Sequence, residues 1–202
     1  MRPTLIIFAK APRMGISKTR LAAGIGTVRA WRVKRAMDSF TCRVSQSSRW
    51  RTKLAVAPDR DLWAQFPGAW LPHLARIPQG RGDLGQRMAG AIRAHSAGPI
   101  CIIGSDLPDL HQSDLAAAFA KLRAFDVVLG PAKDGGYWLI GMRSRCARRA
   151  NLDHVRWSCA STLADTLATL PSTWRVAYLR ELEDIDDAAS FKRRRKTFQR
   201  VT

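Results

Sequence analysis

The chain has 202 residues, 46% hydrophobic and 25% charged, and these are ordinary values for a globular protein. This length favours one domain spanning residues 1–202, and no run approaches the roughly 18 uncharged apolar residues of a membrane-spanning helix. The net charge of +18 favours anionic partners, although a bias spread over solvated surfaces explains it equally well.

The first predicted element is a short apolar strand at residues 5–8, which leads into a basic loop. Pro12 and Gly15 indicate the loop, and a helix is expected from Leu21 to about Val44. The loop carries four cations, Lys10, Arg13, Lys18 and Arg20. Because ligands bind at the carboxyl ends of strands in open α/β sheets, and cations near a helix N-terminus attract phosphates, we predict a nucleotide-phosphate site here. The alternative is a basic surface turn.

The residues at this position argue against a P-loop. The Walker A motif needs glycine where Pro12 and Ser17 stand. Pro12 has no backbone N–H to offer a phosphate, and Ser17 resists the positive φ that glycine supplies.

Strands and helices alternate along the rest of the chain, which predicts a mostly parallel sheet with helices on both faces. Further strands are expected at residues 53–57, 70–77, 100–103, 126–129, 137–141 and 175–178. Helices are expected at residues 61–65, at 84–97, from Ser113 or Asp114 as the capping residue to Leu122, at 160–170 and from 187 onward. The last one carries a basic run at residues 192–196, typical of a solvated helix end or of a nonspecific nucleic-acid contact.

Three acidic segments follow predicted strands. Asp106, in Gly-Ser-Asp-Leu-Pro after residues 100–103, is expected to face the basic loop and to bind Mg²⁺ or Mn²⁺, or else to cap a turn. Asp134, before Gly135, is placed to touch a metal or an acceptor, or lies in a type I′ hairpin turn. Asp186 would complete a metal site, while Asp187 fits an acidic helix N-terminus.

A glycine-rich turn at residues 79–88 offers a second candidate contact for a nucleotide. Gln79 could read a base edge, Gly82 and Gly85 could let the base approach the backbone, and Arg87 could neutralise a phosphate. The four histidines do not form a catalytic or zinc set. His154 and Trp157 either line an acceptor pocket or serve packing and the surface.

Taken together, these motifs resemble the DUF2064 family of GT-A-type glycosyltransferase-like proteins, over about residues 5–191. The family is similar to 2-phospholactate guanylyltransferase and to molybdenum cofactor guanylyltransferase. The resemblance implies a GT-A fold, in which the loop after the first strand holds phosphates and Asp106 and Asp186 hold the metal. The chain departs from the family pattern at Met14, Ser17 and Asp187, where proline, valine and threonine are usual.

The candidate residues have three roles. Catalytic candidates are Lys18, Asp106 and Asp134; nucleotide-binding candidates are Ala9, Lys10, Arg13, Gly15, Lys18, Arg20, Gln79, Gly82, Asp83, Arg87 and Ser105; metal candidates are Asp106 and Asp186.

These features favour a metal-dependent transferase with a nucleotide-activated donor. The resemblance, rather than the residues, puts first a glycosyltransferase that uses an NDP-sugar and a small-molecule acceptor. The alternative is a nucleotidyltransferase acting on a small phosphorylated acceptor. A basic nucleic-acid-binding module ranks below both, and a family member without activity is a further alternative.

Four cysteines without zinc or disulfide spacing, and an N-terminal apolar run too short for a signal peptide, predict a cytoplasmic protein.

Overall fold

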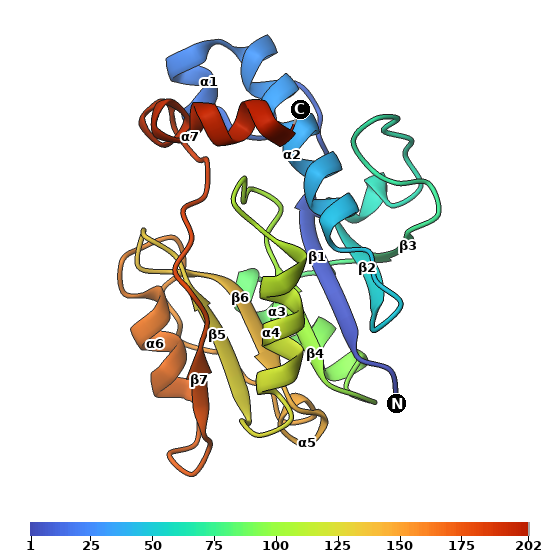
Figure 1. Ribbon diagram of the computed structural model, residues 1–202, viewed down its shortest axis with the longest axis vertical. Coiled ribbons are helices and arrows are strands. Elements are labelled where there is room, and N and C mark those ends of the chain that lie inside the picture. Colours follow the sequence, from blue (N-terminus) through green and yellow to red (C-terminus); the bar gives the residue numbers. More distant parts are fainter. Residues whose placement is uncertain (202) are drawn as a thin grey trace.

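The computed structural model places the backbone of residues 1–201 and the side chains of residues 1–194. A seven-stranded sheet with the order β3-β2-β1-β4-β6-β5-β7 forms its centre (Figure 1). The strands are β1 (Thr4–Lys10), β2 (Arg51–Ala57), β3 (Ala75–Pro78), β4 (Ile100–Ile103), β5 (Val127–Pro131), β6 (Tyr137–Met142) and β7 (Val176–Tyr178). Strand β6 is antiparallel to both of its neighbours, and the other pairs are parallel. The predicted α/β fold with a mostly parallel sheet is confirmed.

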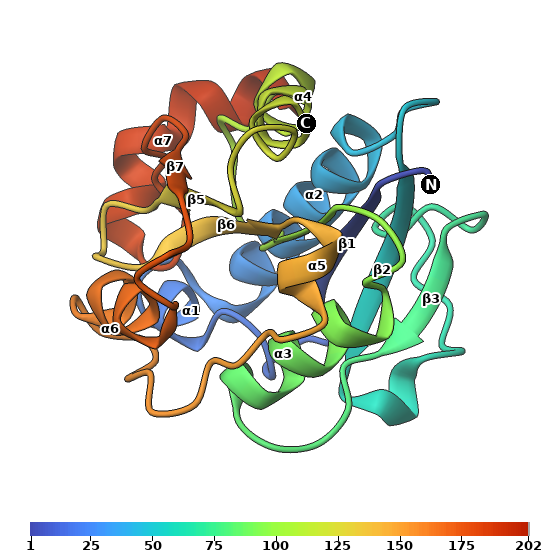
Figure 2. The ribbon, with the colours of Figure 1, turned by 90° about the horizontal axis from the view of Figure 1, so that it is seen from below.

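Helices cover both faces of the sheet, as Figure 2 shows. The helices are α1 (Thr19–Ile25), α2 (Thr27–Val44), α3 (Leu84–Ala94), α4 (Gln112–Lys121), α5 (Ser144–Ala147), α6 (Thr162–Thr169) and α7 (Ala188–Val201). Alternate side chains of β1 point to opposite faces of the sheet. Leu5 and Ile7 pack toward α2 and α4, while Ile6 packs toward α3. Every strand in the middle of the sheet is therefore buried on both sides.

The C-terminal helix returns to the start of the chain. Phe191 of α7 joins Leu21 of α1, Met37 of α2 and Ile185 in a third apolar cluster. Figure 1 shows α7 lying beside α1 and α2. The predicted basic C-terminal helix is present, but the side chains of Arg195 and Lys196 lie outside the described residues.

Several predicted boundaries were wrong for local reasons. The helix expected from Leu21 to Val44 is two helices, because Gly26 has φ of 86°, a conformation that ends a helix. The strand expected at residues 70–77 is confined to β3, and Trp70 is instead buried in the loop before it. Neither Ser113 nor Asp114 occupies the N-cap position of α4, which is taken by His111. The backbone N–H of His111 donates to Asp114 Oδ2 at 2.8 Å. The helix expected at residues 61–65 is a single 3₁₀ turn, Asp59–Asp61.

Within the described residues, no helix is both long enough and apolar enough to cross a membrane.

Candidate active site

The site lies where the parallel strands β1 and β4 end side by side. Ile7 of β1 is paired with Ile103 of β4, so the basic loop after β1 and the acidic loop after β4 leave the sheet at the same edge. Lys18 Nζ lies 2.8 Å from Asp106 Oδ2. Lys18 has φ of 59° just before α1, a left-handed conformation that is uncommon outside glycine. The expected approach of the basic loop to Asp106 is therefore present.

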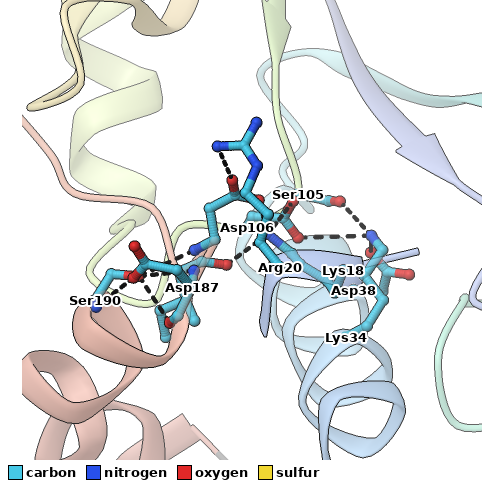
Figure 3. A network of polar contacts seen from close by, with 10 residues as sticks. Lys18, Arg20, Lys34, Asp38, Ser105, Asp106, Asp187 and Ser190 are labelled. Carbon is cyan, nitrogen blue, oxygen red and sulfur yellow. Dashed lines mark hydrogen bonds and ion pairs between the residues drawn. The ribbon is translucent and has the colours of Figure 1, made fainter. Parts of the chain in front are cut away.

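The segment after β7 contacts both Lys18 and Asp106. The backbone N–H of Ile185 donates to Asp106 O at 3.0 Å, and the carbonyl of Ile185 accepts from Lys18 Nζ. Asp186 lies 3.4 Å from Lys18 Nζ and 3.0 Å from Arg20 Nη1. Residues far apart in the sequence thus meet in one network of alternating charges (Figure 3). We call this group, Lys18, Arg20, Asp106 and Asp186, the charge cluster.

A buried ion pair supports the charge cluster from below. On α2, Lys34 Nζ lies 2.5 Å from Asp38 Oδ1, and the two side chains are only 3% and 1% exposed. Lys34 also donates to Ser105 Oγ at 2.8 Å and lies 3.6 Å from Asp106 Oδ1 (Figure 3). Asp38 accepts a further bond from Trp70 Nε1 at 3.3 Å. Sequence reasoning missed this pair, because lysine and aspartate four residues apart usually mark a solvated helix face.

These cations fix the charge of Asp106. Burial raises the pKa of Asp106, but Lys18 and Lys34 together outweigh it, so the pKa lies below its ordinary value. Burial likewise lowers the pKa of Lys34, and the carboxylates of Asp38 and Asp106 reverse that effect. Asp106 is therefore a carboxylate, and Lys34 a cation, at neutral pH.

A cleft with two lobes opens above the charge cluster. The polar lobe encloses about 410 Å³ and is lined mainly by charged and polar side chains, including those of Lys10, Lys18, Lys34, Gln79, Arg87, Ser105, Asp106 and Asp186. The apolar lobe encloses about 310 Å³ beside it and is lined mainly by apolar and aromatic side chains. Asp106, Phe8 and Trp157 line both lobes, so the two lobes meet at these residues.

Other predicted residues lie elsewhere. Arg13 is held by Asp61, with its Nε 3.0 Å from Oδ2, and lines neither lobe; its predicted phosphate contact stays a prediction. Asp83 caps α3 by accepting from Gln86 N at 2.8 Å. Gly82, with φ of 95°, belongs to the same turn.

Two further predicted contacts belong to the backbone scaffold. Ala9 is buried inside β1, and its carbonyl accepts from the side-chain amide of Gln79 at 3.3 Å. The same amide nitrogen also donates to Ala55 O at 3.0 Å, so one end of the amide predicted to read a base edge already bonds β1 and β2. Gly15 has φ of 78° and turns the loop. The predicted nucleotide roles of these residues stay predictions.

The apolar lobe brings two acidic residues together. Asp134, in the connection between β5 and β6, accepts from Gly136 N at 2.9 Å and lines the lobe. β5 and β6 pair antiparallel, so the connection is a hairpin, but only Gly135 has positive φ (85°), so the expected type I′ turn is not formed. Asp184 also lines the lobe, and sequence reasoning did not select it from the acidic run at residues 183–187. Burial, together with Asp134, Asp106 and Asp186, raises the pKa of Asp184 to about 6 although Lys18 lowers it.

Of the other two residues predicted for an acceptor pocket, one lines the cleft and the other does not. Trp157 lines both lobes, whereas His154 is exposed and lies outside them with φ of 63°.

The carboxylates are suitable ligands for a divalent cation, but they do not form a complete coordination shell. Within the described part of the chain, no group of three His, Cys, Asp or Glu side chains is positioned to hold a metal ion together. Mg²⁺, however, is commonly bound by one or two carboxylates with water and substrate phosphates completing the shell. Asp106 and Asp186 are such a pair, both within 3.4 Å of Lys18 Nζ. Mutual repulsion around Asp184 is what a divalent cation would relieve.

Comparison with known proteins agrees with this architecture. The model of a family described as "Uncharacterized protein conserved in bacteria (DUF2064)" matches residues 40–159, more than half of the chain. Among functionally curated proteins, none matches the sequence.

Three solved structures are similar in fold. A protein from Desulfovibrio desulfuricans G20, provisionally named a nucleotide-diphospho-sugar transferase, shares 24% identity over 99% of this chain and 98% of its own, with a TM-score of 0.84. CMP:2-keto-3-deoxy-manno-octonic acid synthetase complexed with CTP shares 11% identity over the whole of both chains, with a TM-score of 0.61. Rv0371c of Mycobacterium tuberculosis H37Rv, in complex with manganese, shares 15% identity over 96% of this chain and 97% of its own, with a TM-score of 0.52. These likenesses establish a nucleotide-diphospho-sugar transferase fold.

Proposed function

The chain belongs to the DUF2064 family, and from this starting point we propose that it is a metal-dependent transferase with a nucleotide-activated donor, in the first place a glycosyltransferase using an NDP-sugar. The observation that carries the proposal is the position of Lys18 between Asp106 and Asp186 at the polar lobe. Cations suited to a diphosphate and carboxylates suited to a divalent ion meet there at one sheet edge.

The polar lobe binds the donor diphosphate in this proposal. Lys10, Lys18 and Arg87 line it and supply positive charge to the phosphate oxygens, and Lys34 adds a buried charge behind Ser105. Mg²⁺ or Mn²⁺, held by Asp106 and Asp186, would offset the negative charge that grows on the departing diphosphate. Preorganised charges of this kind need no reorganisation during the reaction, and they supply much of the catalysis in group transfer.

The apolar lobe presents the acceptor. The hydroxyl oxygen of the acceptor bonds to C1 of the donor sugar while the bond from C1 to the diphosphate oxygen breaks. The electron pair of the broken bond stays with the diphosphate. The hydroxyl proton passes to the carboxylate of Asp134, which lines the lobe and is exposed at its edge. The cleft then serves mainly to hold donor and acceptor in reacting geometry.

Nucleotidyl transfer is the second candidate, favoured by the likeness to a synthetase that binds CTP. In that reaction an acceptor phosphate oxygen bonds to the α-phosphorus of a nucleoside triphosphate, and pyrophosphate leaves. The polar lobe would hold the triphosphate in the same way.

A panel of donors tests the proposal. Thermal melting is measured with UDP-sugars, GDP-sugars, GTP and CTP, each with Mn²⁺ or Mg²⁺. Sugar nucleotides are expected to stabilise the protein, and triphosphates alone would do so if the second candidate holds. Asp106→Asn should abolish the ligand-induced shift, while Asp109→Asn is the matched control because Asp109 shares the loop but lines neither lobe. The proposal fails if no nucleotide stabilises the wild-type protein.

A further inference from the structure

The apolar lobe has walls that suit a compact apolar molecule. Met88 of α3, Ile102 of β4 and Ile140 of β6 form its inner wall, and Tyr137 and Trp157 add aromatic rings. The rings of Tyr137 and Trp157 lie edge to face, with their centroids 6.3 Å apart. Small-molecule sites are typically concave and mostly apolar, with a few polar groups that orient the ligand.

The charged groups of the apolar lobe are all of one sign. Asp106, Asp134 and Asp184 line it, and among the described residues no lysine, arginine or histidine does so. Lys18 is the cation that acts on Asp184, and it is already bonded to Asp106 and Asp186. Without a bound divalent cation, a phosphate in this lobe would therefore meet carboxylates with no lysine, arginine or histidine beside it, whereas Lys10 and Arg87 line the polar lobe.

We propose that the apolar lobe selects an uncharged acceptor with an apolar or aromatic face and a free hydroxyl group, and that it rejects phosphorylated acceptors. The inference rests on the proposed function and decides between its two candidates, since nucleotidyl transfer to a phosphorylated acceptor would need cations in this lobe. The carboxylates of Asp134 and Asp184 lie where such a hydroxyl group can bond to them.

Two probes that share one aromatic body test the inference directly. Phenyl β-D-glucoside is uncharged and carries hydroxyl groups, and phenyl phosphate carries a dianion on the same ring. Binding of each to the full chain is measured by calorimetry, without any nucleotide. The glucoside is expected to bind about tenfold more tightly than the phosphate, the ratio that one screened like-charge contact produces.

Substitutions at the edge of the apolar lobe locate the binding. Ala132 is partly exposed and lines the lobe, so Ala132→Phe fills the cavity and should weaken glucoside binding about tenfold or more. Ala168→Phe is the matched control, because Ala168 is exposed on α6 and does not line the lobe, and it should leave glucoside binding unchanged. Asp134→Asn keeps an oxygen for the bond from Gly136 N but removes a charge, and it should raise affinity for phenyl phosphate selectively. Asp134 is exposed, so this variant is expected to fold even if Ala132→Phe does not.

The inference is overturned if the glucoside does not bind, if phenyl phosphate binds as tightly, or if neither the folded Ala132→Phe protein nor Asp134→Asn changes binding as stated. A nucleoside diphosphate that competes with the glucoside would also overturn it, because the lobe would then hold the base. The donor panel is independent of these probes. Glucoside binding without any nucleotide binding would defeat the proposed function alone, and nucleotide binding with equal probe affinities would defeat only this inference.

Discussion

Replacing Lys34 by methionine is expected to destabilise the fold strongly. The change leaves the Asp38 carboxylate, 1% exposed, without its cation, while Trp70 Nε1 still donates to it at 3.3 Å. Removing one member of a buried ion pair costs about 3–5 kcal/mol, because the other charge stays desolvated and unpaired. Lys34→Met should therefore lower the free energy of unfolding by about 3–4 kcal/mol. The double variant Lys34→Met/Asp38→Leu removes both charges and should recover at least half of that loss.

Urea unfolding followed by tryptophan fluorescence measures these free energies. Arg32→Met is the control, since Arg32 is exposed on the same helix and its loss should change stability by less than about 0.5 kcal/mol. The reasoning is refuted if Lys34→Met costs less than about 1 kcal/mol. It is also refuted if the double variant is as unstable as the sum of the two single variants, because a real pair must show coupling.

Three further predictions concern packing and pH. Gly135→Ala should lower the melting temperature, because φ is +85° and the added Cβ would lie 2.3 Å from Ala160 O; an unchanged melting curve would contradict the described turn. Phe191→Ala should lower the free energy of unfolding by about 3 kcal/mol and speed amide exchange in α1, and unaltered exchange there would show that α7 does not hold α1. Burial raises the pKa of Asp114, but the bonds from Arg180 and from the His111 amide outweigh it, so the pKa lies below its ordinary value. The stability from this carboxylate is full above the ordinary value and is lost as pH falls through the lowered pKa, so the cost of Asp114→Ala should shrink at low pH; a cost that is constant with pH would exclude the ion pair as its source.

The sequence is sufficient to predict that the basic loop and the first acidic loop meet. An apolar strand followed by a basic loop, and a second one followed by Gly-Ser-Asp, place Lys18 and Asp106 at one edge of a parallel sheet, and the structure puts them 2.8 Å apart. The reason is general: the carboxyl ends of parallel strands converge, so residues that follow them meet even when far apart in sequence.

Side-chain partners were beyond such reasoning. In the sequence, Arg13 looked as suitable for a phosphate as Lys18, but it forms an ion pair with Asp61 in the 3₁₀ turn after β2. Lys34 looked solvated, yet it is buried under Asp106. Local pattern does not say which face of α2 turns toward the acidic loop or which carboxylate an arginine reaches, because both depend on tertiary packing.

The affinity for UDP and GDP, measured by calorimetry with Mn²⁺ and then with a chelator, tests the central claim most directly. The charge cluster is held responsible for binding a diphosphate together with a divalent cation. At least one diphosphate should bind about tenfold or more tightly with Mn²⁺ than with the chelator, and Asp106→Asn should remove that difference. Equal affinity with and without Mn²⁺, or metal-dependent binding that survives Asp106→Asn, would contradict the account.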